Sequence, residues 1–319
     1  MSGRDAAREA FLRIAGWTLD GAAPIPGDAS RRSYLRLRHA EETAILMDAP
    51  PDTGEDTRAF HRIADHLRGH GLSAPRIMAA DHDAGFLLLE DLGPEQVADH
   101  LSRHPQDEVG IYTAIADVLV RLHGCALPSG LPRMTPETAA DMLDPFFDHA
   151  APNAPRAKIR AEVQHLFTAL AGPAQTLSLR DFHAENLIWR PDRSGLDRIG
   201  LLDFQDAFVA PAAYDLVSLL RDARRDVGVD AERAVMDRFA VGTGRDQEPL
   251  ARDVALLSVQ RNLRVLGIFA RLIHVDGKPR YRAFVPRVLA HVRRDLTHPS
   301  LDRLCHLVQD HLDLEGQMT

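Results

Sequence analysis

The chain has 319 residues, of which 45% are hydrophobic and 26% are charged, and its formal net charge at pH 7 is −8. These values fit a globular protein with a substantial core, arranged as one large or two coupled domains. The negative charge argues against a nucleic-acid binder that depends on a basic surface, and no apolar run approaches the length of a membrane span.

The cysteines and the N-terminal segment bear on the compartment. Cys125 and Cys305 are isolated and show no CxxC spacing, so we expect neither a disulfide framework nor a zinc site. Residues 1–17 lack the apolar core of a signal peptide. We therefore expect a cytoplasmic protein with no nucleic-acid or membrane partner, and the oligomeric state stays open.

The first part of the chain is predicted to form a small lobe with antiparallel strands. The predicted elements are a helix over 5–15, short alternating strands between 23 and 49, a helix over 57–70, and strands over 76–79 and 86–91. In the segment SYLRLRH, Leu35 and Leu37 alternate with polar residues, as expected for a strand with one buried face. We place this lobe at residues 1–93.

Beyond Gly93 the apolar spacing is mainly helical. The predicted helices span 95–103, 107–124, 136–150, 155–171, 212–226, 230–240, 247–273, 279–296 and 299–312. The segment 175–209 is the one strand-like interruption. We therefore predict a large helical lobe over residues 94–319 and a two-lobe α+β fold.

Two acidic residues follow apolar runs within this interruption. Residues 175–179 lead to Asp181 and residues 199–202 lead to Asp203, so each run is predicted to be a short strand that delivers an acid. Phosphoryl transfer to a hydroxyl needs a carboxylate that orients the acceptor and oxygen ligands for Mg²⁺ on the nucleotide phosphates. We predict Asp181 as the catalytic carboxylate and Asn186 and Asp203 as magnesium ligands.

Each of these residues has an ordinary alternative when taken alone. Asp181 could pair with Arg180 in a loop, and Asp203 could cap a turn. His183 could contact the acceptor or hold the loop through a backbone hydrogen bond. We include His183 with Asp181 as a candidate catalytic residue.

The segment GDASRRSY at 27–34 lies between strand candidates, where a glycine-rich loop would cover phosphates through backbone N–H groups. It has one glycine, and an ordinary hairpin loop is the alternative. Residues 90–92 end the last strand of the small lobe, where the backbone would bind adenine. The candidate nucleotide-binding residues are Asp28, Ser30, Arg31, Arg32, Arg36, Glu90 and Leu92.

The strand ILMDA lacks the lysine that reaches the nucleotide phosphates in protein kinases, and Met47 stands in its place. The small lobe contains no lysine. The phosphate charge then needs another cation, for which we consider Arg31, Arg32 and Arg36.

The spacing DxHxxN after one strand and DF after another resembles the aminoglycoside phosphotransferase and choline kinase-like branch of the protein kinase-like fold. The segments GDASRRSYLRL, ILMDAPP, FLLLEDLG, DFQDA, YDLVSLLRDAR and LGIFARL are similar to those of the anomeric amino-sugar kinases of bacterial cell-wall recycling. The resemblance runs from about residue 27 to about residue 290. One departure is Leu179, where the family usually has a histidine or a small residue before the Arg-Asp pair.

This resemblance implies ATP and Mg²⁺ as cofactors, the anomeric hydroxyl of N-acetylmuramate and N-acetylglucosamine as acceptor, and Asp215 as a structural acid that braces the catalytic loop. Gln205 and Arg221 are the candidate substrate-binding residues, Arg221 because an acidic sugar needs a cation for its carboxylate. Arg224 and Arg225 are interpreted as a solvated helix face. The alternatives are a kinase for an aminoglycoside, choline or homoserine, and a pseudokinase without turnover.

Overall fold

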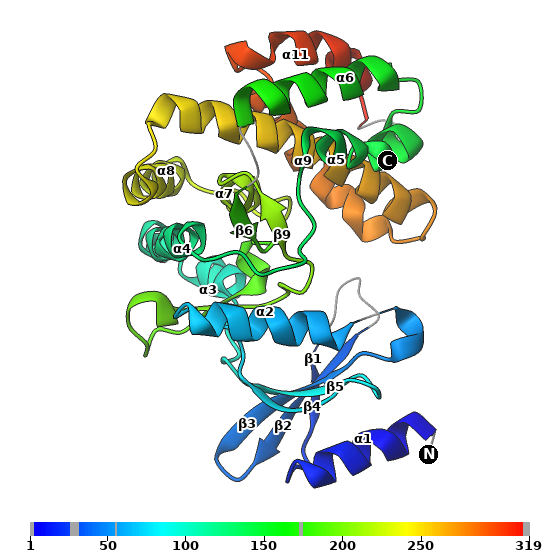
Figure 1. Ribbon diagram of the computed structural model, residues 1–319, viewed down its shortest axis with the longest axis vertical. Coiled ribbons are helices and arrows are strands. Elements are labelled where there is room, and N and C mark those ends of the chain that lie inside the picture. Colours follow the sequence, from blue (N-terminus) through cyan, green and yellow to red (C-terminus); the bar gives the residue numbers. More distant parts are fainter. Residues whose placement is uncertain (1–2, 26–31, 55, 172–174, 315–319) are drawn as a thin grey trace. The chain divides into compact units, whose positions relative to one another are not determined.

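The structure is a computed structural model that describes residues 3–25, 32–54, 56–171 and 175–314 (Figure 1). The chain forms two compact units, one of Met1–His100 with Glu185–Asp206 and the other of Leu101–Ala184 with Ala207–Thr319. The first unit thus includes a segment from far along the sequence. The assignment of residues 1–93 and 94–319 to two functional lobes stays a prediction.

The first unit contains a five-stranded antiparallel sheet with the order β1-β2-β3-β5-β4. Its strands are β1 (Ala23–Ile25), β2 (Ser33–His39), β3 (Glu42–Asp48), β4 (Ile77–Asp81) and β5 (Phe86–Glu90). These strands confirm the small antiparallel sheet predicted from alternating apolar residues.

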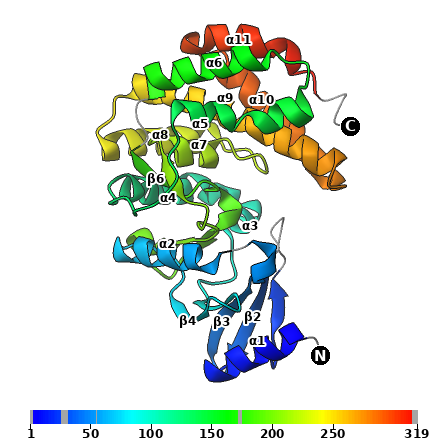
Figure 2. The ribbon, with the colours of Figure 1, turned by 45° about the vertical axis from the view of Figure 1, so that its right-hand side comes forward.

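Helices cover the two faces of this sheet. Helix α1 (Gly3–Ile14) contributes Phe11 and Leu12 to a core with Leu37 and Leu46, whereas α2 (Thr57–Gly69) lies over the opposite face (Figures 1 and 2). Because side chains alternate along a strand, Met47 faces away from the α1 core, and it is buried there at 1% exposure. The position of the missing lysine is therefore filled by an apolar side chain.

The second segment of the first unit forms the hairpin of β7 (Leu187–Trp189) and β8 (Ile199–Leu201). Its backbone is joined to the first segment by bonds from Trp189 N to Glu95 O (2.8 Å) and from Leu201 N to Ser73 O (2.8 Å). A Cβ atom at Gly200 would lie 2.9 Å from Leu92 Cδ1 and 3.1 Å from Ile188 Cβ, so a larger residue would force these two side chains to shift. These contacts explain why the hairpin belongs to the first unit.

The second unit is mainly helical, and a short hairpin of β6 (Thr176–Ser178) and β9 (Phe208–Ala210) lies within it. Its helices are α4 (Glu108–His123), α5 (Pro136–Asp141), α6 (Arg156–Leu166), α7 (Tyr214–Leu220), α8 (Val229–Thr243), α9 (Gln247–His274), α10 (Val285–Asp295) and α11 (Asp302–Val308), while α3 (Val97–Arg103) crosses the unit boundary. The long helix α9 approaches the backbone of Pro145 so closely that a side chain at Gly267 would lie 2.1 Å from it.

Several predicted helices are shorter than expected. The helix predicted over 136–150 is interrupted before a π-helical turn at Phe146–Ala150. The helix predicted over 212–226 ends at Leu220, because the Asp222 carboxylate accepts the Arg224 backbone N–H (2.8 Å) and so competes with helical hydrogen bonding.

In the part of the chain described here, no helix has the length and apolar character required to traverse a bilayer.

Candidate active site

The loop that carries Asp181 is braced by one buried carboxylate in the second unit. The loop follows β6, and Asp215 at the start of α7 accepts hydrogen bonds from Ser178 Oγ (2.7 Å), Leu179 N (2.7 Å) and Arg180 N (3.1 Å). All three donors lie directly before Asp181. The bracing role that the family resemblance implies for Asp215 thus has a matching set of hydrogen bonds.

Arg180 adopts a strained backbone conformation, with a φ of 72°. Its carbonyl oxygen accepts a bond from Ser218 Oγ (3.3 Å), and the same hydroxyl accepts a bond from Arg261 of α9 (2.9 Å). The backbone before Asp181 is therefore fixed by α7 and α9. Asp181 itself is partly exposed.

The substitution Asp215→Asn is expected to loosen this loop. Burial raises the pKa of Asp215 to about 6, so the carboxylate is ionised at neutral pH and accepts all three bonds. An asparagine cannot accept all of them, and one lost buried acceptor costs about 1–3 kcal/mol of unfolding free energy. We expect that loss in urea unfolding at pH 7.5, together with a lower kcat.

The same residue predicts a pH effect on the wild type. As the pH falls through about 6, Asp215 is protonated and the brace weakens, so kcat should fall in this range. An acid limb near pH 4 and none near pH 6 would contradict this assignment.

His183 lies two residues after Asp181 and is buried at 7% exposure. Its Nε2 atom lies 3.4 Å from Arg224 Nη1. Burial, together with the positive charges of Arg224 and Arg261, lowers the pKa of His183 well below 6.5. The imidazole is therefore neutral at physiological pH and supplies no positive charge to the site.

This histidine predicts a second pH dependence. In the unfolded chain His183 takes up a proton below about pH 6.5, whereas in the folded chain it stays neutral, so the folded state loses stability as the pH falls below that value. The loss approaches about 1.4 kcal/mol per pH unit. In urea unfolding at pH 7.5 and 5.5, the His183→Asn variant should show a smaller loss than the wild type. Equal losses would contradict the neutral, buried histidine.

The first unit brings together four of the predicted site residues. Asn186 Nδ2 lies 3.3 Å from Asp203 Oδ2, Gln205 Nε2 donates to Asp203 Oδ1 (2.8 Å), and Arg32 Nη1 lies 3.9 Å from the same oxygen. Two features hold this arrangement: Leu202 N donates to Asn186 O (3.0 Å), and Asp203 has a φ of 57°. These four residues therefore form a compact polar cluster.

Asn186 and Asp203 fit a magnesium ion. The Asp203 side chain is 44% exposed, and rotation of the Asn186 amide would turn its oxygen toward the same space. Mg²⁺ prefers oxygen ligands and takes one or two from protein, with water and nucleotide phosphates completing its shell. Across the described ranges no cluster of three or more His, Cys, Asp or Glu side chains is arranged for a metal ion.

The other predicted nucleotide-binding residues of the first unit lie at the end of β5 or form hydrogen bonds with the segment that follows it. Arg36 donates two bonds to Asp91 (2.8 and 3.1 Å) and one to Gly93 O (3.1 Å). Glu90 accepts from Arg76 N (3.1 Å), and Leu92 is buried. The hydrogen bonds of Arg36 thus go to Asp91 and Gly93, in the segment after β5. The predicted residues Asp28, Ser30 and Arg31 lie outside the described residues.

Arg221, which we predicted as a ligand for an acidic sugar, is buried in the second unit. Its guanidinium pairs with Asp295 (2.9 Å) and Glu232 (3.0 Å). Asp295 also accepts a hydrogen bond from Ser258. The substrate-binding role of Arg221 stays a prediction, and these contacts give it no support because two carboxylates already neutralise the guanidinium.

Ser178 and Ser218 were missed by sequence reasoning, although both position the catalytic loop. Serine is common in every kind of segment, and its distance from Asp215 or Arg180 in space cannot be read from spacing. Asp215 could have indicated Ser178, because a carboxylate that braces the loop needs hydrogen-bond donors there.

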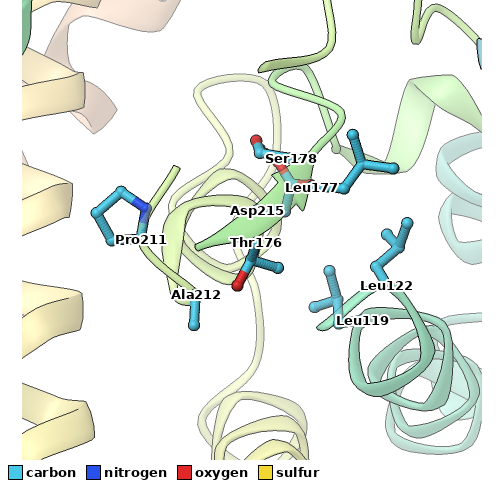
Figure 3. A pocket seen from close by; sticks show the side chains of 8 residues that line it. All are labelled: Leu119, Leu122, Thr176, Leu177, Ser178, Pro211, Ala212 and Asp215. Carbon is cyan, nitrogen blue, oxygen red and sulfur yellow. Dashed lines mark hydrogen bonds between the residues drawn. The ribbon is translucent and has the colours of Figure 1, made fainter. Parts of the chain in front are cut away.

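A small pocket lies beside β6 and α4 in the second unit (Figure 3). It is lined by Leu119, Leu122, Thr176, Leu177, Ser178, Pro211, Ala212 and Asp215. It has space for about one water molecule, so it cannot hold a sugar or a nucleotide. We therefore do not place a substrate there.

A small antiparallel sheet in one unit and a mainly helical second unit are the architecture of the protein kinase-like fold, which small-molecule phosphotransferases share. The sequence matches the phosphotransferase enzyme family (APH) over residues 21–254. The chain belongs to this family.

Curated relatives carry a more specific name. One from Caulobacter vibrioides, named N-acetylmuramate/N-acetylglucosamine kinase, is 36% identical, and the match covers 95% of each chain. One of the same name from Pseudomonas aeruginosa is 32% identical over 89% of this chain and 87% of its own. Among solved structures, a choline/ethanolamine kinase family protein from Mesorhizobium loti matches with a TM-score of 0.65 at 16% identity, covering 96% of this chain and 99% of that one. That likeness supports the fold.

Proposed function

We propose that this protein is an ATP-dependent kinase that phosphorylates the anomeric hydroxyl of N-acetylmuramate and N-acetylglucosamine. The acceptor follows from the curated relatives, which match nearly the whole chain at up to 36% identity. The observation that carries the chemistry is the Asn186–Asp203 pair, which follows the braced loop of Asp181. The proposed location is the cytoplasm, where ATP is available as co-substrate.

In this proposal Asp181 orients the acceptor and takes its proton as the bond to the γ-phosphorus forms. An anomeric hydroxyl is more acidic than the other hydroxyls of a sugar, so a carboxylate is a sufficient proton acceptor. His183 stays neutral and holds the loop next to Asp181. Nucleotide binding is assigned to residues 1–93, and catalysis and acceptor binding are assigned to residues 94–319.

Asn186 and Asp203 would hold Mg²⁺ on the nucleotide phosphates. The ion, when bound, neutralises charge that develops on the transferred phosphoryl group. Gln205 donates to Asp203 and so fixes the direction of one carboxylate oxygen. That contact favours a positioning role for Gln205 over direct contact with the sugar.

Arg32 is our candidate for the cation that replaces the missing lysine. Its guanidinium lies 3.9 Å from Asp203, whereas Arg36 is held by Asp91 and Gly93 O. We expect Arg32→Met to raise the KM for ATP about tenfold, the effect of losing about 1.4 kcal/mol of binding. Arg38→Met serves as the control, because Arg38 is an exposed arginine on β2, the strand that begins directly after Arg32. An unchanged KM for ATP in the Arg32 variant would contradict this role.

The experiment that tests the proposed function is a coupled ADP-release assay with Mg·ATP. The acceptors are N-acetylmuramate, N-acetylglucosamine, glucose, choline, homoserine and kanamycin, and Asp203→Asn protein serves as the blank. Turnover on the two amino sugars supports the proposal. Turnover confined to another acceptor would keep the mechanism and replace the substrate, whereas bound ATP without turnover on any acceptor would favour a pseudokinase.

A further inference from the structure

We propose that Arg264 on α9 binds the lactyl carboxylate of N-acetylmuramate and thereby sets the preference between the two amino sugars. This inference rests on the proposed function, because the two acceptors differ by that group: N-acetylmuramate carries a lactyl ether with a carboxylate, and N-acetylglucosamine carries a hydroxyl in its place.

Arg264 lies on the side of α9 that faces the catalytic loop. Arg261, three residues earlier, donates to Ser218 Oγ (2.9 Å), and that hydroxyl donates to Arg180 O (3.3 Å). Residues three apart on a helix share a face and lie about 5 Å apart. Arg264 is thus one helical turn from the contact between α9 and the loop.

The charges that act on Arg264 include that of the Asp181 carboxylate. Burial lowers the pKa of Arg264, Tyr214 and Asp181 raise it, and Arg180 and Arg261 lower it further. These groups all belong to the second unit. Arg264 and the acceptor-orienting Asp181 therefore share one unit, whereas Asn186, Asp203 and Arg32 belong to the first unit.

Arg264 is half-buried and carries an incomplete set of contacts. Within the described ranges its side chain has no hydrogen bond or ion pair with another residue. A guanidinium has five N–H donors, and leaving such donors partly desolvated without an acceptor is costly. The buried Arg221, by contrast, has two carboxylate partners.

The surroundings favour an anion as the missing partner. Arg180, Arg224 and Arg261 add positive charge in the same region, and Arg180 packs its guanidinium over the Phe208 ring at 5.8 Å. Of the nearby acids, Asp215 and Asp222 are already used in backbone hydrogen bonds, and Asp181, which acts electrostatically on Arg264, is assigned to the acceptor hydroxyl. A carboxylate can accept two parallel bonds from one guanidinium, which is the geometry that arginine recognises best.

The test compares two sugars in one variant. For Arg264→Met we expect kcat/KM on N-acetylmuramate to fall about 100-fold, and kcat/KM on N-acetylglucosamine to stay within about threefold. Arg271→Met is the matched control, because Arg271 lies on the same helix, is 51% exposed and should leave both values unchanged. Arg264→Lys keeps the charge but not the paired donors, and should show an intermediate loss on N-acetylmuramate.

A neutral carboxamide analogue of N-acetylmuramate gives an independent readout. The wild type should lose about 100-fold in kcat/KM on the carboxamide relative to the acid, and Arg264→Met should not distinguish the two. If Arg264→Met is unstable, kcat/KM on the acid and on the carboxamide is compared between the wild type and Arg264→Lys instead. An equal loss on both sugars, or wild-type indifference to the carboxamide, would overturn the role of Arg264. A wild type inactive on both sugars would instead refute the proposed function and the inference with it.

Discussion

Asp181→Asn is expected to lower kcat by at least about 100-fold while the protein keeps its fold. General-base groups contribute about 10²- to 10⁴-fold, and asparagine keeps the shape of aspartate but cannot take a proton. The loop should hold its conformation, because Asp215 bonds to Ser178, Leu179 and Arg180 and not to the Asp181 side chain.

The controls for this prediction separate chemistry from binding. The midpoint of thermal unfolding and the affinity for Mg·ATP should match those of the wild type, because the Asn186–Asp203 pair is untouched. Asp192→Asn, at an exposed position of the turn between β7 and β8, should show wild-type kcat. Full activity of Asp181→Asn would remove Asp181 from the catalytic assignment.

Asp203→Asn is expected to lower kcat/KM for ATP by about a thousandfold. A metal ion supplies several kcal/mol of stabilisation to the transferred group, and a loss of about 4 kcal/mol corresponds to that factor. Asparagine is preferred to alanine here, because Asp203 has a φ of 57° and asparagine tolerates this region well. The variant therefore removes charge without forcing the backbone to change.

The dependence on metal concentration should identify the cause of that loss. Because the variant binds Mg²⁺ more weakly, its activity should rise with Mg²⁺ well above the concentration that saturates the wild type. Nucleotide affinity measured without any divalent ion should be similar in both proteins. A variant with the wild-type Mg²⁺ dependence would show that Asp203 is not a metal ligand.

The small lobe could be predicted well from the sequence because its strands expose one face and bury the other. The alternation that placed Leu35 and Leu37 on one side of β2 appears in the structure, where Leu37 is fully buried and Leu35 packs against the same core. Such a pattern is local, with a period of two residues, and needs no knowledge of distant partners.

The pair of Asn186 and Asp203 could also be predicted, although 17 positions separate these residues. Each follows or precedes a short apolar run, and pairing of β7 with β8 brings the two ends together. The two side chains lie close together because a hairpin connects neighbouring segments, for which sequence order and spatial order agree. Their role as magnesium ligands stays a prediction.

The ion pairs that Arg221 forms could not be predicted from the local sequence pattern. Its partner Asp295 lies 74 positions away on another helix, and the periodicity of apolar residues does not indicate that pairing. The early end of α7 has a similar origin, because the Asp222 side chain replaces a helical hydrogen bond. Arg264 was overlooked for the same reason, since its position opposite the loop depends on how α9 packs.

The most direct test of the central claim is phosphorus NMR of the product made from N-acetylmuramate and Mg·ATP. We predict one sugar phosphate whose phosphorus couples to the anomeric proton, formed by the wild type and absent with Asp181→Asn. A product phosphorylated at another hydroxyl would contradict the proposed reaction, and the same product formed at the same rate by Asp181→Asn would contradict the proposed mechanism.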